Sequence, residues 1–124
     1  MIITRNYITR QYVRDHPEWI FLFGDNLVHE GYGGQAKEMR GEPNAVGIPT
    51  KKYPDNRSES FFTDNEYEAN CRAIYEAFHK IPKGTTVVIP SAGLGTGLAR
   101  LDTMAPKTFK YLDYKIRQLM ESDR

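Results

Sequence analysis

Cysteine and histidine are scarce in this chain, which limits the chemistry that it can perform. The lone cysteine, Cys71, excludes an intrachain disulfide bond and suits a reducing compartment, so we expect a cytoplasmic protein. The three histidines, His16, His29 and His79, show no metal-ligand spacing, and His29-Glu30 is not followed by a second histidine four residues on. The sequence therefore predicts neither a metal site nor a bound cofactor.

Long apolar runs and an excess of charge of either sign are also absent. The longest apolar runs, Trp19–Phe23 and Val87–Ile89, are far too short to span a membrane, and the N-terminus has no continuous apolar stretch typical of a secretory signal. Lysine and arginine total 17 against 16 aspartates and glutamates, which gives a formal net charge of +1. This balance argues against a protein that mainly follows the phosphates of a long nucleic acid, and no membrane partner is expected.

Two well-known phosphate-binding motifs are missing. A Walker A loop requires Gly-Lys followed by Ser or Thr, and this tripeptide does not occur. The dinucleotide fingerprint Gly-x-Gly-x-x-Gly fails because Leu98 stands where a motif beginning at Gly93 needs its last glycine. A motif beginning at Gly95 fails in the same way at Arg100. By its fingerprint the chain is not a Rossmann oxidoreductase.

The length and pattern of the chain predict a single α/β domain over residues 1–124. Hydrophobic residues make up 40% and charged residues 27% of the chain, as in an ordinary globular domain. Short apolar runs alternate with helical patterns, which favours a three-layer α/β/α fold, a compact mixed or largely parallel sheet with helices on both faces. We expect an edge strand at Ile2-Ile3 and buried strands at Trp19–Phe23, Asn44–Ile48 and Thr85–Ile89, ended by Gly24, Pro49 and Pro90.

Three helices are predicted between and after these strands. The first is short and runs from Gly34 to Arg40. The second begins at a capping box, Thr63-Asp64-Asn65-Glu66, and continues with apolar residues at helical spacing until Pro82. The last follows Asp102 as its N-cap. The polar segment before the second helix has no pattern, and its residues 55–60 are typical of either a mobile lid or a disordered loop.

A glycine-rich loop directly follows the predicted strand Thr85–Ile89. Three glycines at alternate positions permit a tight turn and present backbone N–H groups to an anion. In open α/β sheets, ligands bind at the carboxyl ends of the strands. We therefore interpret this loop as one that holds a diphosphate, the alternative being a turn that only joins a strand to a helix. Its candidate binding residues are Ser91, Gly93, Leu94, Gly95, Thr96 and Gly97.

A second polar loop follows the predicted strand Trp19–Phe23. Asp25 and Asn26 are short polar residues that can bind sugar hydroxyls at the end of a buried strand. Further on, Gly33 and Gly34 would let a ligand lie against the backbone. The alternative is a turn, because Asp, Asn and Gly dominate turns for purely local reasons.

A third candidate segment, Thr50-Lys51, follows the predicted strand Asn44–Ile48. A lysine at the carboxyl end of a buried strand becomes a nucleophile when burial lowers its pKa. On spacing alone, the pair Lys51-Lys52 is more typical of two solvated surface lysines.

Together, the three loops resemble those of a macrodomain, the ADP-ribose-binding α/β module. The stretch FLFGDNLVHEGYGGQAKEM is similar to the first signature of that family, with Asn26 at the asparagine for the distal ribose and Gly33-Gly34 in the glycine run. The stretch VVIPSAGLGTGLARLD is similar to the strand, diphosphate loop and helix of the second signature. The resemblance extends from about Trp19 to Asp102, roughly two-thirds of the chain.

The match is closest to the branch that holds the terminal ADP-ribose protein glycohydrolase and the antitoxins that remove ADP-ribose from DNA. Ile48-Pro49-Thr50-Lys51 and Gly97-Leu98-Ala99-Arg100-Leu101 resemble two segments of that branch. The lysine of the first segment is catalytic there and is thought to attack the anomeric carbon of the distal ribose. The resemblance therefore assigns this role to Lys51 and reverses the preference from spacing.

Two departures from the family pattern bear on the site. Ala99 stands where one enzyme of the branch has an acid, and Asp102, three residues on, is the candidate acid or base in its place. Asn6 and Tyr7 stand where many macrodomains have an acidic residue for adenine.

The resemblance implies a protein that binds ADP-ribose, with a glycohydrolase as the leading hypothesis. Such an enzyme would take an ADP-ribosylated protein or nucleic acid as its partner and remove the ADP-ribose. Two alternatives stay open. One is a binder or sensor of ADP-ribose or a related nucleotide without catalysis, which Ala99 motivates. The other is an unrelated nucleotide-binding α/β protein whose glycine-rich loops face a different phosphate.

Overall fold

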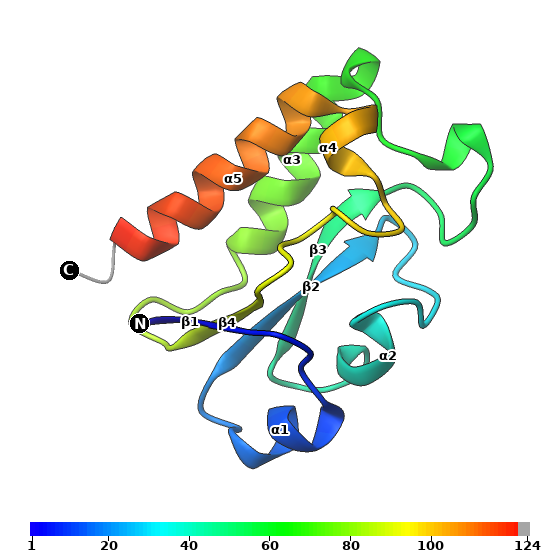
Figure 1. The fold of residues 1–124 in the computed structure, drawn as a ribbon. Helices are drawn as coiled ribbons and strands as arrows, with labels where there is room; N and C mark the ends of the chain where they lie inside the picture. Colours follow the sequence, from blue (N-terminus) through cyan, green and yellow to red (C-terminus); the bar gives the residue numbers. More distant parts are fainter. Residues whose placement is uncertain (122–124) are drawn as a thin grey trace.

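The computed structural model describes residues 1–121, which contain one four-stranded sheet (Figure 1). The strands lie in the order β1-β4-β2-β3, and each neighbouring pair runs parallel. Their bounds are β1 (Ile2–Arg5), β2 (Ile20–Asn26), β3 (Ala45–Lys51) and β4 (Val87–Pro90). The sheet, expected to be mixed or largely parallel, is parallel in all its described strands, so their carboxyl ends meet at one edge.

Helices cover both faces of the sheet and complete the predicted three-layer α/β/α fold (Figure 1). One face carries α1 (Arg10–Asp15) and α2 (Ala36–Met39). The other carries α3 (Tyr67–Phe78), α4 (Leu101–Met104) and α5 (Pro106–Glu121). Two 3₁₀ helices, η1 (Ser58–Ser60) and η2 (Asp64–Glu66), precede α3. No helix within residues 1–121 is both long and apolar enough to cross a membrane.

Each face of the sheet has its own hydrophobic core. In β2, Phe21 and Phe23 pack into the core under α1 and α2, whereas Leu22 packs into the core under α3, α4 and α5. In β4, Val88 faces the first core, and Val87 and Ile89 face the second. Successive side chains of a strand point to opposite faces, so a continuous apolar run buries all its residues in a covered sheet. Each fully buried side chain of this kind stabilises the fold by about 1.5–3 kcal/mol.

Two strands continue past the residues that were predicted to end them. β2 runs through Gly24 to Asn26, and β3 runs through Pro49 to Lys51. Proline is tolerated in β3 because this strand forms an edge of the sheet, where one side of the backbone needs no partner strand. The longer strands carry Asp25, Asn26 and Lys51 on the strands themselves rather than in the loops that follow, and the pairing of β2 with β3 shifts register between Asp25 and Asn26.

The helix termini differ from the prediction. Thr63 makes no capping hydrogen bond with its side chain, so the predicted capping box is wrong. Its neighbour Asp64 instead accepts hydrogen bonds from the backbone N–H groups of Lys107 (2.9 Å) and Thr108 (3.0 Å) at the start of α5. Asp102 is not an N-cap either, because it lies within the short helix α4, and α5 begins separately at Pro106.

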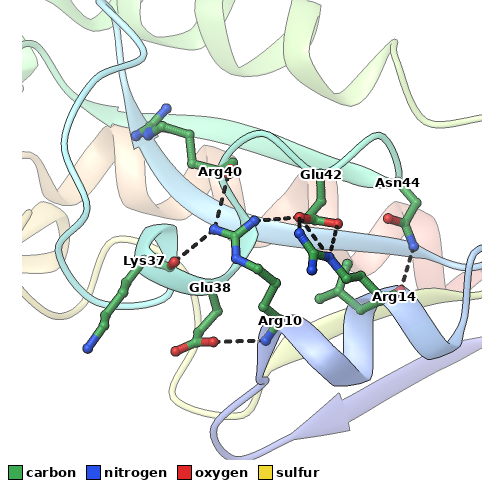
Figure 2. A network of polar contacts seen from close by, with 8 residues as sticks. Arg10, Arg14, Lys37, Glu38, Arg40, Glu42 and Asn44 are labelled. Atoms are coloured by element: carbon green, nitrogen blue, oxygen red, sulfur yellow. Dashed lines mark hydrogen bonds and ion pairs between the residues drawn. The ribbon is translucent and has the colours of Figure 1, made fainter.

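A polar network joins α1, which was not predicted, to α2 (Figure 2). The backbone N–H of Arg10 donates to Glu38 (2.8 Å), and its guanidinium donates to the carbonyl of Lys37 (2.9 Å). Glu42 accepts from both Arg10 and Arg14. These contacts hold α2 in place, and α2 is the element that leads into Arg40 at the candidate site.

Candidate functional site

A cavity of about 660 Å³ lies at the carboxyl ends of the strands. Its walls are the loops that follow β2, β3 and β4, together with Asn6 and Tyr7 after β1. The size is that of a pocket for a small molecule or nucleotide. Most of the predicted site residues line it, namely Asp25, Asn26, Gly33, Gly34, Thr50, Lys51, Ser91, Gly93, Gly95, Thr96 and Gly97.

Two predicted site residues do not line this cavity. Leu94 is 3% exposed and packs in the core with Leu101. Asp102 is exposed on α4 and is not part of the cavity wall. Leu94 alternates with glycines along the loop. Its side chain packs into the core, whereas the neighbouring Gly93 and Gly95 line the cavity.

The glycine-rich loop needs glycine at Gly95. Its φ of +78° is one that other residues rarely adopt, and a Cβ there would lie 3.0 Å from Leu101 Cβ and 3.1 Å from Thr50 Cγ2. The loop is held from within, because Thr96 Oγ1 donates to the carbonyl of Ala92 (2.8 Å) and Leu101 donates to the carbonyl of Gly95 (2.7 Å). This bonding fixes the backbone before any ligand arrives.

The backbone N–H groups of this loop are not all equivalent. That of Gly93 donates to the carbonyl of Pro90 (2.9 Å) and is therefore occupied. Those of Gly95, Thr96 and Gly97 donate to no group among residues 1–121. Consecutive N–H groups beside a cavity form a concave site for an anion, and each charge-assisted hydrogen bond there contributes about 1.5–3 kcal/mol. In the predicted diphosphate loop, the backbone N–H groups that are free to bind an anion therefore lie after Leu94.

Lys51 is the last residue of β3 and is only 7% exposed, although it lines the cavity. Its Nζ lies 4.7 Å from the centre of the Phe61 ring. Burial lowers the pKa of Lys51, the carboxylate of Asp55 opposes this shift, and the positive charge of Arg100 adds to it. The ion pairs formed within residues 1–121 do not include Lys51. A lysine in this setting is neutral at lower pH than an exposed one and can act as a nucleophile.

Asp25 and Asn26 shape the loop after β2. The carboxylate of Asp25 accepts a hydrogen bond from Arg40 Nη2 (2.7 Å) and lies 2.7 Å from Nδ1 of His29. Asn26 Nδ2 donates to the carbonyl of Glu30 (2.7 Å), and its Oδ1 accepts from the N–H of Val28 (3.1 Å). Both residues line the cavity, but their side-chain polar atoms already have partners in the following loop and at Arg40, which fits the turn alternative.

Tyr7 and Arg40 also line the cavity, and the sequence did not single them out as binding residues. Tyr7 is 52% exposed, and its hydroxyl donates to Glu38 (2.9 Å), which holds the ring at the cavity wall. Next to it, Asn6 Oδ1 accepts from the hydroxyl of Ser91 (2.7 Å) and joins the end of β1 to the glycine-rich loop. The pairing of β1 with β4 creates this contact, and no local pattern signals it.

Residues 1–121 contain no group of three or more histidine, cysteine, aspartate or glutamate side chains arranged to hold a metal ion. No curated protein and no solved structure was found to be similar to the chain. A family model matches residues 3–115, which include every residue of the cavity wall and, apart from Ile2 at the start of β1, the four strands of the described sheet. The chain therefore belongs to that family, which is described as a family of unknown function (DUF7831).

Proposed function

We propose that the cavity binds ADP-ribose and that the protein is a glycohydrolase that removes ADP-ribose from a modified protein or nucleic acid. One observation carries the proposal. The unbonded N–H groups of Gly95, Thr96 and Gly97 share a cavity with the buried amine of Lys51. The first can hold a diphosphate, and the second can attack a sugar carbon.

The order of the strands fits the linear arrangement of the parts of ADP-ribose. Tyr7 follows β1 at one end of the sheet, the glycine-rich loop follows the neighbouring β4, and Lys51 ends β3 at the opposite edge. ADP-ribose has an aromatic base, a diphosphate and a distal ribose in the same linear order. In the proposed complex the base lies at Tyr7, the diphosphate at the glycine-rich loop and the anomeric carbon at Lys51.

The reaction then follows from the neutral amine of Lys51. Its nitrogen attacks the anomeric carbon, so that a carbon–nitrogen bond forms while the bond to the modified macromolecule breaks. The leaving group departs with the bonding electrons, and the amine releases a proton to solvent. Water next hydrolyses the carbon–nitrogen bond and returns ADP-ribose and the free lysine. Asp102 does not act as acid or base in these steps, because it is exposed and does not line the cavity.

Calorimetric titration with ADP-ribose tests the binding step, with AMP and ribose 5-phosphate as controls. We expect micromolar affinity for ADP-ribose, about −8 kcal/mol, and much weaker binding of either fragment. Absence of both heat and a thermal shift with ADP-ribose would refute the proposal. Binding of AMP alone would favour the alternative of an unrelated nucleotide-binding α/β protein.

The Lys51→Ala variant tests the chemical step. It should release no ADP-ribose from a modified substrate while it still binds ADP-ribose. Lys52→Ala is the matched control, because Lys52 forms an ion pair with Glu66 and does not line the cavity. Full turnover by Lys51→Ala would remove Lys51 from the mechanism.

A second candidate function is binding of ADP-ribose without hydrolysis. It is favoured because the cavity wall offers no free carboxylate at Ala99 or Asp25. Ala99 lines the cavity and offers no carboxylate there, and the carboxylate of Asp25 is bound by Arg40. Tight binding of ADP-ribose by the wild-type protein, with no release from either modified protein or modified DNA, would establish this function instead.

A further inference from the structure

The segment between β3 and α3 folds back onto the end of β3. Phe61 forms an isolated antiparallel bridge with Lys51, and the N–H of Lys52 donates to the carbonyl of Ser60 (2.7 Å). Within the segment, Asp55 accepts hydrogen bonds from Arg57 and from the hydroxyl of the fully buried Ser60. These contacts place the segment, with residues 55–60 in it, against the end of β3 at Lys51.

The ring of Phe61 is the part of this segment that reaches the reactive lysine. Phe61 is 4% exposed, and its ring centre lies 4.7 Å from Lys51 Nζ. The guanidinium carbon of Arg100 lies 5.7 Å from the same ring centre. One aromatic ring therefore contacts two cationic side chains, and it occupies space beside the amine that water would otherwise fill.

Arg100 is itself held in an unusual conformation. Its φ is +47°, in the left-handed region, where residues other than glycine are uncommon. The backbone keeps it there, because its N–H donates to the carbonyl of Gly97 (3.1 Å) and its carbonyl accepts from the N–H of Met104 (2.8 Å). Strain of this kind persists where the surrounding structure requires it, and here it places Arg100 against the Phe61 ring.

We propose that Phe61 is a positioning residue for Lys51, whose ring fixes the amino group at the cavity wall and keeps water from one side of it. The role rests on the proposed function of Lys51 as the nucleophile. A ring face attracts an ammonium group but solvates it less well than water does, so a lysine against a ring loses hydration. Two charged groups act on Lys51 as well, the carboxylate of Asp55 within the folded segment and the guanidinium of Arg100 before α4.

Three substitutions at Phe61 separate this role from simple packing. Phe61→Ala admits water to the amine, so the pKa of Lys51 should rise toward that of an exposed lysine. Phe61→Leu keeps the site dry but removes the ring face that attracts the ammonium group, so the pKa of Lys51 should not rise. Phe61→Tyr keeps the ring and should behave as wild type. If these substitutions only loosened the fold, the pKa of Lys51 would instead rise in both the alanine and the leucine variant.

The measurement is the rate at which trace acetic anhydride acetylates Lys51 as a function of pH, read by fragment-ion mass spectrometry that separates Lys51 from Lys52. The exposed Lys80 serves as the internal reference. Phe62→Leu is the matched control, because Phe62 is 1% exposed and belongs to the core under α3, α4 and α5. It should lower the melting temperature without moving the titration of Lys51.

The outcomes distinguish this role from the proposed function, because the labelling uses the protein without ADP-ribose. A titration midpoint for Lys51 that rises in Phe61→Ala, but not in Phe61→Leu or Phe61→Tyr, supports the proposal. The same midpoint in all variants, or parallel shifts in the alanine and leucine variants, overturns it whether or not ADP-ribose is hydrolysed. If the alanine variant does not fold, the leucine variant decides: a midpoint for Lys51 below that of the wild type supports the role of the ring, and an unchanged or higher midpoint overturns it.

Discussion

Arg40 holds the buried carboxylate of Asp25 through a hydrogen bond of 2.7 Å between Nη2 and Oδ1. The Asp25 side chain is 4% exposed, at the end of β2, and Arg40 lies just after α2. The same guanidinium donates to the carbonyls of Gly31 (2.8 Å) and Glu30 (3.1 Å). One side chain therefore joins β2 to the loop that walls the cavity.

Substituting Arg40 should weaken the fold and disorder that loop. In Arg40→Met the carboxylate of Asp25 stays buried and keeps only His29 beside it, and the loss of one partner of a buried ion pair typically costs about 3–5 kcal/mol. The expected loss of unfolding free energy is measured by urea denaturation. Adding Asp25→Asn removes the unpaired charge, so the double variant should be more stable than Arg40→Met alone. A double variant that is less stable by the sum of both single losses would contradict the coupling.

Gly95→Ala should weaken the binding of ADP-ribose by about tenfold or more, corresponding to about 1.4 kcal/mol. The added Cβ would require a strained φ and would approach Leu101 and Thr50 within 3.1 Å, so the loop must move. Calorimetric titration measures the loss of affinity. Gly97→Ala is the control for folding, because its φ is not positive and no atom lies within 4 Å of its added Cβ. The melting temperature of Gly97→Ala should equal that of the wild type.

The rate of ADP-ribose release should rise with pH through the pKa of Lys51, because the neutral amine is the attacking form. Burial lowers that pKa, so the midpoint should lie below 10.5, the ordinary value for lysine. The unfolded chain then binds more protons than the folded one between the two values, so stability should also rise with pH there. A pH series of turnover numbers, with thermal unfolding in parallel, checks both signs. A rate that is flat from neutral pH to pH 10.5 would contradict the neutral-amine mechanism.

Asp64→Ala should destabilise the protein by about 1 kcal/mol, as the loss of a helix cap does. Its carboxylate accepts from the N–H groups of Lys107 and Thr108, which are among the unpaired donors at the start of α5. Thermal or urea unfolding measures the change. Asp113→Ala is the control, since Asp113 forms an exposed ion pair with Arg117 one turn away on α5, and its loss should cost less than half as much.

The parts of the fold that were predicted correctly depend on local patterns. The run from Trp19 to Phe23 indicates a strand buried on both faces, and β2 places Phe21, Leu22 and Phe23 alternately in the two cores. The helical spacing of apolar residues after Thr63 indicates the helix that the structure shows as α3. Its cap was predicted wrongly, because the side chain of Thr63 makes no capping hydrogen bond, and neighbouring Asp64 bonds instead to Lys107, 43 residues away.

In the candidate site, too, some features follow from local sequence and others depend on contacts between distant segments. Glycines at alternate positions after a strand indicate an anion-binding loop from sequence alone, because conformational freedom is a local property of each residue. Only the structure separates Gly93, whose N–H is occupied, from Gly95, whose N–H is not. Leu94 could not be assigned to the core rather than the cavity without knowing what packs beneath the loop.

The amino-acid pattern was enough to predict an α/β domain with polar loops at the ends of buried strands, because alternation, apolar runs and glycine spacing act over a few residues. The strand order β1-β4-β2-β3, which brings Tyr7 and Lys51 to one cavity, could be known only from the folded chain. The same is true of the Phe61 ring, which lies against Lys51. Strand pairing and burial depend on contacts between distant segments, and no pattern within one segment specifies its partner.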